Sequence, residues 1–244
     1  MTREEQLTKA FVGLADTLAD GFDPVVLLDR LAGHCIDLTG ADAVGVTMAT
    51  TRGDLRIIAV APHQQETLTD LVRLQAADGP ARDCYRTRRP VNATDLSGDA
   101  DDWPEFAPRA RQAGYRAAHA LPLRVNHHAI GAVTLLLTAP GGLPTTDLRL
   151  AQALADVAAV ALVHWSPDPA RPMDILTQAQ AAVAAKATVE MAQGMLAEYG
   201  RLDPAQAMDA LHAYCCRDGY RLTEVAQSLV RRTLAPETVL AALR

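Results

Sequence analysis

The spacing of apolar residues predicts two helices at the start of the chain. Residues 4–20 carry apolar side chains three or four positions apart, which is a helical period. The apolar positions of this helix are Leu7, Phe11, Leu14 and Leu18. A second helix is predicted from Asp23-Pro24, because Asp23 can cap the first turn and Pro24 suits its first position.

Four later segments have the apolar pattern of strands. Ala43–Thr50 and Leu55–Ala61 flank an Arg-Gly-Asp turn and predict a β-hairpin. Ala117–Leu123 and Ala129–Leu137 flank a polar turn and predict a second hairpin. Two hairpins of this kind indicate an antiparallel sheet.

The segment between the hairpins, residues 62–115, is predicted to hold a helix over 66–76 and otherwise irregular chain rich in Gly, Pro and Asp. After the second hairpin, Thr146-Asp147 opens a long amphipathic helix. These elements predict an α+β domain over residues 1–165. Its antiparallel sheet would have helices on one face and loops over the other.

A proline-rich stretch follows this domain. Residues 166–172 read SPDPARP, a composition that breaks any helix and predicts a linker. Residues 173–244 carry no strand pattern and predict an all-α domain. Its first helix, 173–197, is rich in Ala with a narrow apolar seam, which is either bundle core or a dimer interface. The helix is longer than a three-helix bundle needs, which favours self-association.

The starts and stops of the later helices are marked by capping residues. Asp203 as N-cap, Pro204 at the first position and Gln206 at the third predict where the second helix of this domain begins. It ends before the Asp-Gly pair at 218–219, and a third helix starts near Leu222. With a short tail helix, the last domain is predicted to be a small three-helix bundle.

An ordered series of short motifs between residues 77 and 162 resembles the GAF domains of bacterial one-chain regulators. The motifs are a Gly-Pro pair at 79–80, R-x-x-R-P-V at 86–91, D-L at 95–96, W-P-x-F-A at 103–107, A-L-P-L at 120–123 and I-G-A at 130–132. The resemblance covers most of residues 8–165. It implies a pocket for a small effector between the sheet and the chain that covers it.

Several side chains are candidates for lining this implied pocket. They are Cys84, Tyr85, Trp103, Phe106, Tyr115 and His119. Each is as readily a core residue, because such side chains fill the interior of any domain. Cys84 lies near Arg82 and Arg86, which would lower its pKa, but a buried inert thiol is favoured. Neither a metal-ligand spacing nor a haem-ligand motif is present, so no cofactor is expected beyond an unknown small ligand.

The stretch from residue 184 to 230 resembles an ANTAR domain, whose pattern approximates R-x-x-I-E-Q-A-K-G-x-L, then A-F-x-x-L, then L-x-D-V-A. The matching residues are Val189, Glu190, Ala192, Gly194, Leu196, Ala207, Leu211, Leu222, Val225 and Ala226. The resemblance implies a protein, usually dimeric, that binds paired hexaloop stem-loops in nascent RNA and prevents premature termination. Lys186, Gln193 and Met208 depart from the pattern, where the family usually has Arg, a basic residue and Phe.

Recognition of RNA loops requires basic side chains for phosphates and flat groups for splayed bases. The candidates in the last domain are Lys186, Gln193, Arg201, Arg217, Tyr220, Arg221 and Thr223. Tyr220-Arg221 is the best pairing, because it joins a stacking ring to a charge at a helix start. On charge alone, these residues would be read as solvated helix faces, and the family resemblance moves the group toward RNA contact.

Composition limits the remaining function classes. The net charge of −6 gives no overall attraction to nucleic acid, so an RNA site must be a local basic patch. The four scattered cysteines indicate reduced thiols in a cytoplasmic protein, and neither a signal peptide nor an 18-residue apolar run is present. Catalytic motifs such as Gly-x-Ser-x-Gly, a Walker loop or His-Glu-x-x-His are absent, which disfavours an enzyme.

The sequence therefore predicts a GAF–ANTAR transcription antitermination regulator, which senses an unknown stimulus in its first domain and binds RNA with its second. A homodimer and a small-molecule effector are the other expected partners, and no membrane is expected. The alternative is a dimerising protein-interaction regulator with weak or lost RNA binding, motivated by Gln193 and the acidic composition.

Overall fold

The computed structural model describes residues 2–15, 23–63, 66–97, 102–125, 128–164 and 175–243. The predicted linker, residues 166–172, and the end of the helix predicted over 4–20 lie outside the described residues. The chain forms two compact units, which are described separately below. The first comprises Met1–Thr17 and Leu27–Ala181, and the second comprises Leu18–Val26 and Ala182–Arg244.

The first unit is built on a five-stranded antiparallel sheet with the strand order β2-β1-β5-β4-β3. Its strands are β1 (Ala43–Ala49), β2 (Leu55–Ala61), β3 (Val91–Ala93), β4 (Ala117–Val125) and β5 (His128–Leu137). Both predicted hairpins are confirmed, and β1 pairs with β5 to join them. Every residue of β1 is buried, so both faces of the sheet are covered at this strand.

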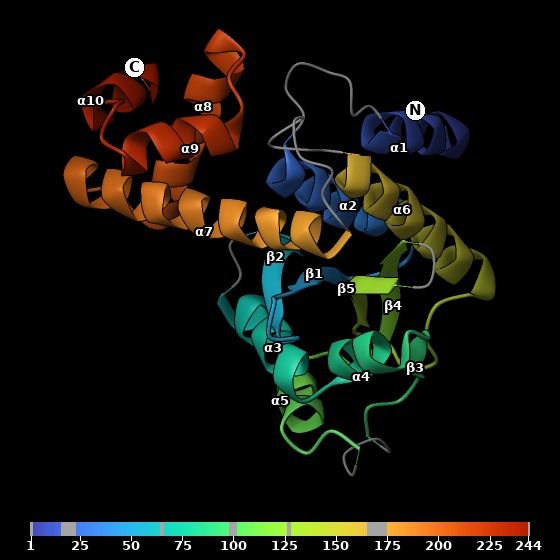
Figure 1. Ribbon diagram of the computed structural model, residues 1–244. Helices are drawn as coiled ribbons and strands as arrows, with labels where there is room; N and C mark the ends of the chain where they lie inside the picture. Colours follow the sequence, from blue (N-terminus) through green and yellow to red (C-terminus); the bar gives the residue numbers. More distant parts are fainter. Residues whose placement is uncertain are drawn as a thin grey trace. The chain divides into compact units, whose positions relative to one another are not determined.

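Helices lie on the two sides of this sheet (Figure 1). One side holds α2 (Pro24–Leu38) and α6 (Thr145–His164), with α1 (Arg3–Ala15) packed against α6. The other holds α3 (Glu66–Ala77), α4 (Pro80–Thr87) and α5 (Phe106–Gln112). The side expected to carry loops therefore carries short helices as well as loops.

The helices α4 and α5 lie in residues 62–115, where the sequence pattern predicted mostly irregular chain after the first helix. They are stabilised by hydrogen bonds between residues far apart in the sequence. An oxygen of the Asp78 carboxylate, after α3, accepts from the backbone N–H groups of Glu105 and Phe106 at 2.9 and 3.3 Å, at the start of α5. The indole N–H of Trp103 donates to the Asp83 carboxylate in α4 at 2.9 Å. These contacts join α3, α4 and α5 into one layer.

The second unit is a helical bundle, as predicted. It contains α8 (Pro204–Asp218), α9 (Leu222–Val230), α10 (Pro236–Leu240), a 3-10 turn (Ala241–Leu243) and most of α7 (Ile175–Gly200). The seam of α7 contributes Val189, Ala192 and Leu196 to the core, each fully buried. The C-terminal half of the apolar seam of α7 is therefore part of the bundle core.

The predicted cap of α8 is present in full. The Asp203 side chain accepts from the backbone N–H of Gln206 at 2.8 Å, and the Gln206 side chain accepts from the N–H of Asp203 at 3.1 Å. At the other end, Gly219 has a φ of 71°, the left-handed conformation that ends many helices. Through the ranges described, no helix is both long and apolar enough to cross a membrane.

Candidate nucleic-acid interface and ligand site

The turn from α8 to α9 carries a stack of two tyrosine rings. Tyr214 and Tyr220 lie on either side of Gly219, with ring centroids 5.8 Å apart and planes 23° apart. Tyr214 is buried, whereas Tyr220 is 52% exposed. Because an aromatic ring fixed on one face can accept a nucleobase on its other face, this stack has the geometry of a base platform.

Arg217 lies against the same stack. Its guanidinium carbon is 5.3 Å from the centroid of the Tyr214 ring, which is a cation–π distance. Its Nη2 lies 2.8 Å from Oδ2 of Asp218, and that carboxylate raises the pKa of Arg217 above its ordinary value. An RNA phosphate would have to compete with Asp218 for this guanidinium.

Arg221 and Thr223 begin α9 just after the stack. Arg221 is the N-cap residue, and its Nη1 lies 3.5 Å from Oε1 of Glu224. The backbone N–H of Thr223 donates to the Asp23 carboxylate at 2.8 Å, and Asp23 belongs to the same compact unit. Within the same unit, Asp23 also accepts from the N–H of Val25 at 2.9 Å.

The remaining RNA candidates lie on α7 or at its end. Lys186 lies 4.0 Å from the Glu190 carboxylate, one turn along the helix. The Gln193 amide donates to the carbonyl of Pro204 at 2.6 Å and so ties α7 to the start of α8. Arg201 is exposed and has a φ of 51° directly after α7.

The structure thus brings Arg217 and Tyr220 together through a third residue, Tyr214, that the sequence analysis missed. The sequence signal that could have identified Tyr214 is its position six residues before Tyr220, with the helix-ending Gly219 between them. Asp218 was missed for a different reason. In the sequence, Asp218 beside Arg217 is interpreted as a pair of solvent-exposed charges. The structure shows that the Asp218 carboxylate binds the Arg217 guanidinium.

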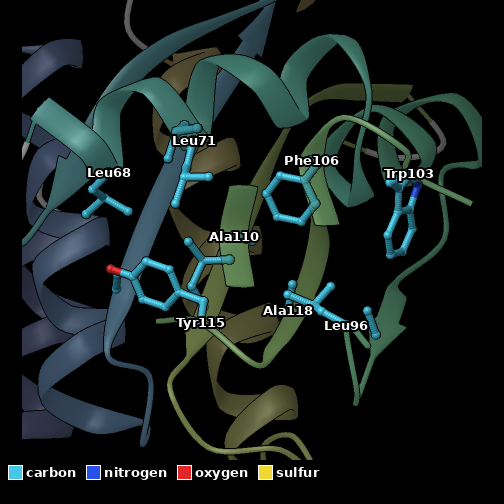
Figure 2. Packing of buried hydrophobic residues seen from close by; sticks show 12 residues of the cluster. Leu68, Leu71, Leu96, Trp103, Phe106, Ala110, Tyr115 and Ala118 are labelled. Carbon is cyan, nitrogen blue, oxygen red and sulfur yellow. The ribbon is translucent and has the colours of Figure 1, made fainter. Parts of the chain in front are cut away.

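In the first unit, three of the ligand candidates are core residues of one cluster (Figure 2). Trp103, Phe106 and Tyr115 are at most 8% exposed, and Trp103 meets Phe106 edge to face at a centroid distance of 6.4 Å. Burial raises the pKa of the Tyr115 hydroxyl, and the nearby Asp42 carboxylate adds to the effect. These aromatic rings pack α5 against α3 and the sheet.

Two further candidates lie on α4, in a second cluster with small residues of β4 and β5. Cys84 is fully buried beside Ala120 and Ala132, and Tyr85 packs against the edge of this cluster. Burial raises the pKa of the Cys84 thiol to about 12. The thiol is therefore neutral near pH 7 and lacks the thiolate that redox sensing requires.

His119 points to the opposite face of the sheet, because it alternates with Ala118 and Ala120 along β4. Its Nε2 accepts from the backbone N–H of Leu143 at 2.9 Å, and its Nδ1 lies 2.9 Å from Oδ1 of Asn92. These two bonds specify the neutral ring with the proton on Nδ1. Burial lowers the pKa of His119, which favours the same form.

Five of the six ligand candidates therefore lie in or against two buried clusters on the face of the sheet that α3, α4 and α5 cover, and His119 lies on the other face. Within the described ranges, no three His, Cys, Asp or Glu side chains are grouped so that they could hold a metal ion. Two buried polar side chains that the sequence analysis missed, Gln75 and Thr134, lie between α3, α4 and the sheet.

Comparison with known families and structures gives the following matches. A GAF domain model matches residues 23–163, and an ANTAR domain model matches residues 177–230. The GAF domain of a phosphoenolpyruvate-protein phosphotransferase from Acinetobacter has a TM-score of 0.52 at 13% identity, covering 69% of this chain and 100% of that one. At that identity the match shows the fold. No curated protein matches the sequence.

Two further solved structures have TM-scores just below 0.5. A GAF domain/HD domain protein from Geobacter sulfurreducens has a TM-score of 0.48 at 16% identity and covers 70% of this chain and 98% of its own. The free methionine-R-sulfoxide reductase from Neisseria meningitidis has a TM-score of 0.49 at 17% identity and covers 75% and 91%.

Proposed function

This chain belongs to the GAF domain family and carries an ANTAR domain after it, and from that premise we propose that it is a signal-responsive RNA-binding transcription antiterminator. Both kinds of domain are regulatory. In the proposed mechanism, a stimulus in the first domain changes how the second domain binds paired hexaloop stem-loops in nascent RNA. The cytoplasm, where transcription occurs in bacteria, is the proposed location.

The observation that carries the RNA proposal is the half-exposed ring of Tyr220, held by Tyr214 with Arg217 on the buried ring. Proteins bind single-stranded loops by stacking splayed bases on aromatic rings and guanidinium planes. Arg201, Arg221 and Lys186 would supply charge for the phosphates around that base. The Thr223 N–H is already bonded to Asp23, so this group is not proposed as an RNA donor.

Two ANTAR domains in a homodimer would bind two stem-loops at once. Linking two weak sites raises the total affinity by about 10²–10⁴ when the spacing allows both to be occupied. This accounts for why a near-neutral bundle with few basic residues would suffice. Sedimentation or mass photometry of the full chain tests the dimer directly.

The test of RNA binding is a gel-shift titration of the full chain at low salt with a two-hexaloop RNA and a scrambled stem-loop. We expect Tyr220→Ala to weaken binding by about tenfold or more, since a stacked base contributes about 1–3 kcal/mol. Tyr199→Ala is the matched control, because Tyr199 is 54% exposed and its hydroxyl donates to Glu237 in another part of the bundle. Wild-type binding no tighter than to the scrambled RNA would overturn the function.

A second candidate function is a dimerising regulator that binds another protein and has weak or lost RNA binding. It is favoured by the charge pairing, since Lys186, Arg217 and Arg221 each lie within 4.0 Å of an acidic group. It is also favoured by Gln193, whose amide is engaged by Pro204. RNA affinity gained by Gln193→Lys where the wild type has none would support this second function, and tight RNA binding by the wild type would exclude it.

A further inference from the structure

Positive charge is concentrated in α4 and in the chain that follows it. Four arginines, Arg82, Arg86, Arg88 and Arg89, lie in this segment against one acid, Asp83. Four positive charges less one negative charge give residues 82–89 a charge of +3, in a chain whose net charge is −6. The proposed RNA interface uses none of these residues, because it belongs to the other compact unit.

Arg82 joins this segment to the turn between β1 and β2. Its Nη1 donates to the carbonyl of Gly53 at 3.0 Å, so α4 and this turn lie side by side. Arg52 is exposed in the same turn and adds a further positive charge, next to the exposed Asp54. Arg82 and Arg86 are about one helical turn apart and lie on the same side of α4.

The strand register places Arg89 at the same end of the sheet as that turn. β3 begins at Val91, opposite Ala120, and runs antiparallel to β4, so the chain just before β3 lies toward the C-terminal end of β4. The turn after β1 lies at this end too, because the C-terminal parts of β1 and β4 both pair with Gly131, near the start of β5. One end of the sheet therefore carries arginines from a turn, a helix and a connecting segment.

Most of this charge is not neutralised within the unit. The Arg86 side chain is 74% exposed, and its Nη2 lies 3.2 Å from Oδ1 of Asp83. The other oxygen of Asp83 accepts from the Trp103 indole at 2.9 Å, so the carboxylate is shared and Arg86 keeps further N–H donors. Arg52 and Arg89 are exposed, and neither forms an ion pair within the described residues.

The side chains around these arginines favour an acidic polypeptide over RNA or a small anion. Surfaces that bind single-stranded RNA combine basic side chains with exposed rings that stack on bases. Among the described residues of the first unit no Phe, Tyr or Trp side chain is exposed, and Tyr85 of α4 packs against the buried cluster around Cys84. A small anion would form only one or two exposed ion pairs, each of which contributes little in water. A polypeptide with several acidic side chains forms several such pairs at once.

We propose that an arginine surface, formed by Arg52, Arg82, Arg86 and Arg89, is a docking site for an acidic segment of another protein. Guanidinium groups bind carboxylates through two parallel N–H···O bonds. On an acidic helix, carboxylates four positions apart have the same spacing as Arg82 and Arg86 on α4, so one face of such a helix can pair with both. This partner would bind the first domain whether or not the second domain binds RNA.

The binding test uses the full chain and two labelled helical peptides, one with Glu at every fourth position and one with Gln in the same places. Fluorescence anisotropy measures binding at low salt and at physiological salt. We expect the Glu peptide to bind and the Gln peptide not to bind. The affinity for the Glu peptide should fall as salt rises, because salt screens exposed charges. Equal binding of the two peptides, or binding of neither, would overturn the proposal.

The variant test reverses two charges of the arginine surface. Arg86→Glu with Arg89→Glu should weaken binding of the Glu peptide about tenfold or more, because two attractions become repulsions. Arg73→Glu with Arg149→Glu is the matched control, since it makes the same change of charge at exposed positions of α3 and α6. The control should keep most of the affinity. An equal loss in both variants would assign the binding to overall charge and make the proposal wrong.

Two further measurements keep the result decisive. Arg86→Gln with Arg89→Gln removes the charges without adding acids near the end of α4, and should weaken binding about threefold with a Tm close to that of the wild type. A single-stranded RNA homopolymer without hexaloops is the second probe. If this RNA binds, loses its affinity in the Arg86→Glu, Arg89→Glu variant and the Glu peptide does not bind, the surface is a nucleic-acid site and the proposal is wrong.

Discussion

Arg201 occupies a backbone conformation that an arginine adopts only at a cost. Its φ of 51° lies in the left-handed region, where glycine meets no steric penalty. We expect Arg201→Gly to stabilise the second unit by up to about 1 kcal/mol and, because a charge is lost, to weaken RNA binding. Denaturant unfolding and RNA titration at two salt concentrations measure the two effects.

Arg88 provides the matched control for that prediction. It has a φ of 59° as the C-cap of α4, in the other compact unit, and is also exposed. Arg88→Gly should give a similar gain in stability and leave RNA affinity unchanged. If the two variants weaken RNA binding equally, Arg201 has no specific role in the interface.

His119 gives the first unit a pH dependence whose sign follows from its bonds. Burial lowers its pKa in the folded state, and the unfolded chain has a value of about 6.5. Below that pH the unfolded chain binds a proton that folded His119 resists, since its Nε2 accepts from Leu143. Stability should therefore be highest above about pH 6.5 and fall as the pH drops toward the folded pKa.

The measurement is denaturant unfolding from about pH 5 to pH 8, for wild type and His119→Gln. The variant should be less stable at the upper end, because Gln cannot reproduce both ring contacts. Its stability should vary less with pH than that of the wild type. Parallel curves would show that another group, such as His34 with its own lowered pKa, causes the dependence.

At the scale of the element, the N-terminal cap of α8 depends only on Asp203 and Gln206, so single substitutions can test it. Asp203→Ala removes the acceptor for the Gln206 N–H and should cost about 1 kcal/mol, whereas Asp203→Ser should keep most of it. Thermal unfolding of the full chain, with circular dichroism to follow the helices, measures both. Equal losses for Ala and Ser would assign the effect to the carboxylate charge and not to the cap.

Elements with strong local signals were predictable from the sequence. The capping box at Asp203, the helix stop at Gly219 and the two hairpins all depend on residues close together in the chain. The short elements α4, β3 and α5 were weakly marked because contacts from afar stabilise them. Asp78 accepts a hydrogen bond from the backbone N–H of Glu105, at the start of α5 and 27 positions later in the sequence. A pattern of neighbouring residues cannot predict such a contact.

The candidate sites also contain residues that the sequence could identify and residues that only the three-dimensional contacts reveal. Motif matching identified Tyr220 and Arg217, but the buried Tyr214 that positions them became visible only in three dimensions. Gln75 reads in the sequence as an ordinary polar position of an amphipathic helix. Its complete burial, with no hydrogen-bond partner among the described residues, depends on how α3 packs over the sheet.

For the whole molecule, the net charge of −6 means that the proposed RNA binding would depend on a local surface and not on overall attraction. A local surface with few cations releases few counterions, so the affinity should fall less steeply with salt than for a strongly basic protein. Regulation of such an interface needs only a modest change in geometry or dimerisation. Typical coupling between two sites is about 1–3 kcal/mol, or roughly 5–150-fold in affinity.

If the first domain binds an effector and the second binds RNA, as proposed, the two binding events obey a thermodynamic requirement that holds for any arrangement of the two units. If a saturating effector of the first domain changes the Kd for the two-hexaloop RNA by some factor, RNA must change the Kd for that effector by the same factor. We expect equal factors well away from one, measured by titrating each ligand with and without the other. Factors of one in both titrations would leave a ligand site and an RNA site that do not communicate, and the sensor proposal would then be wrong.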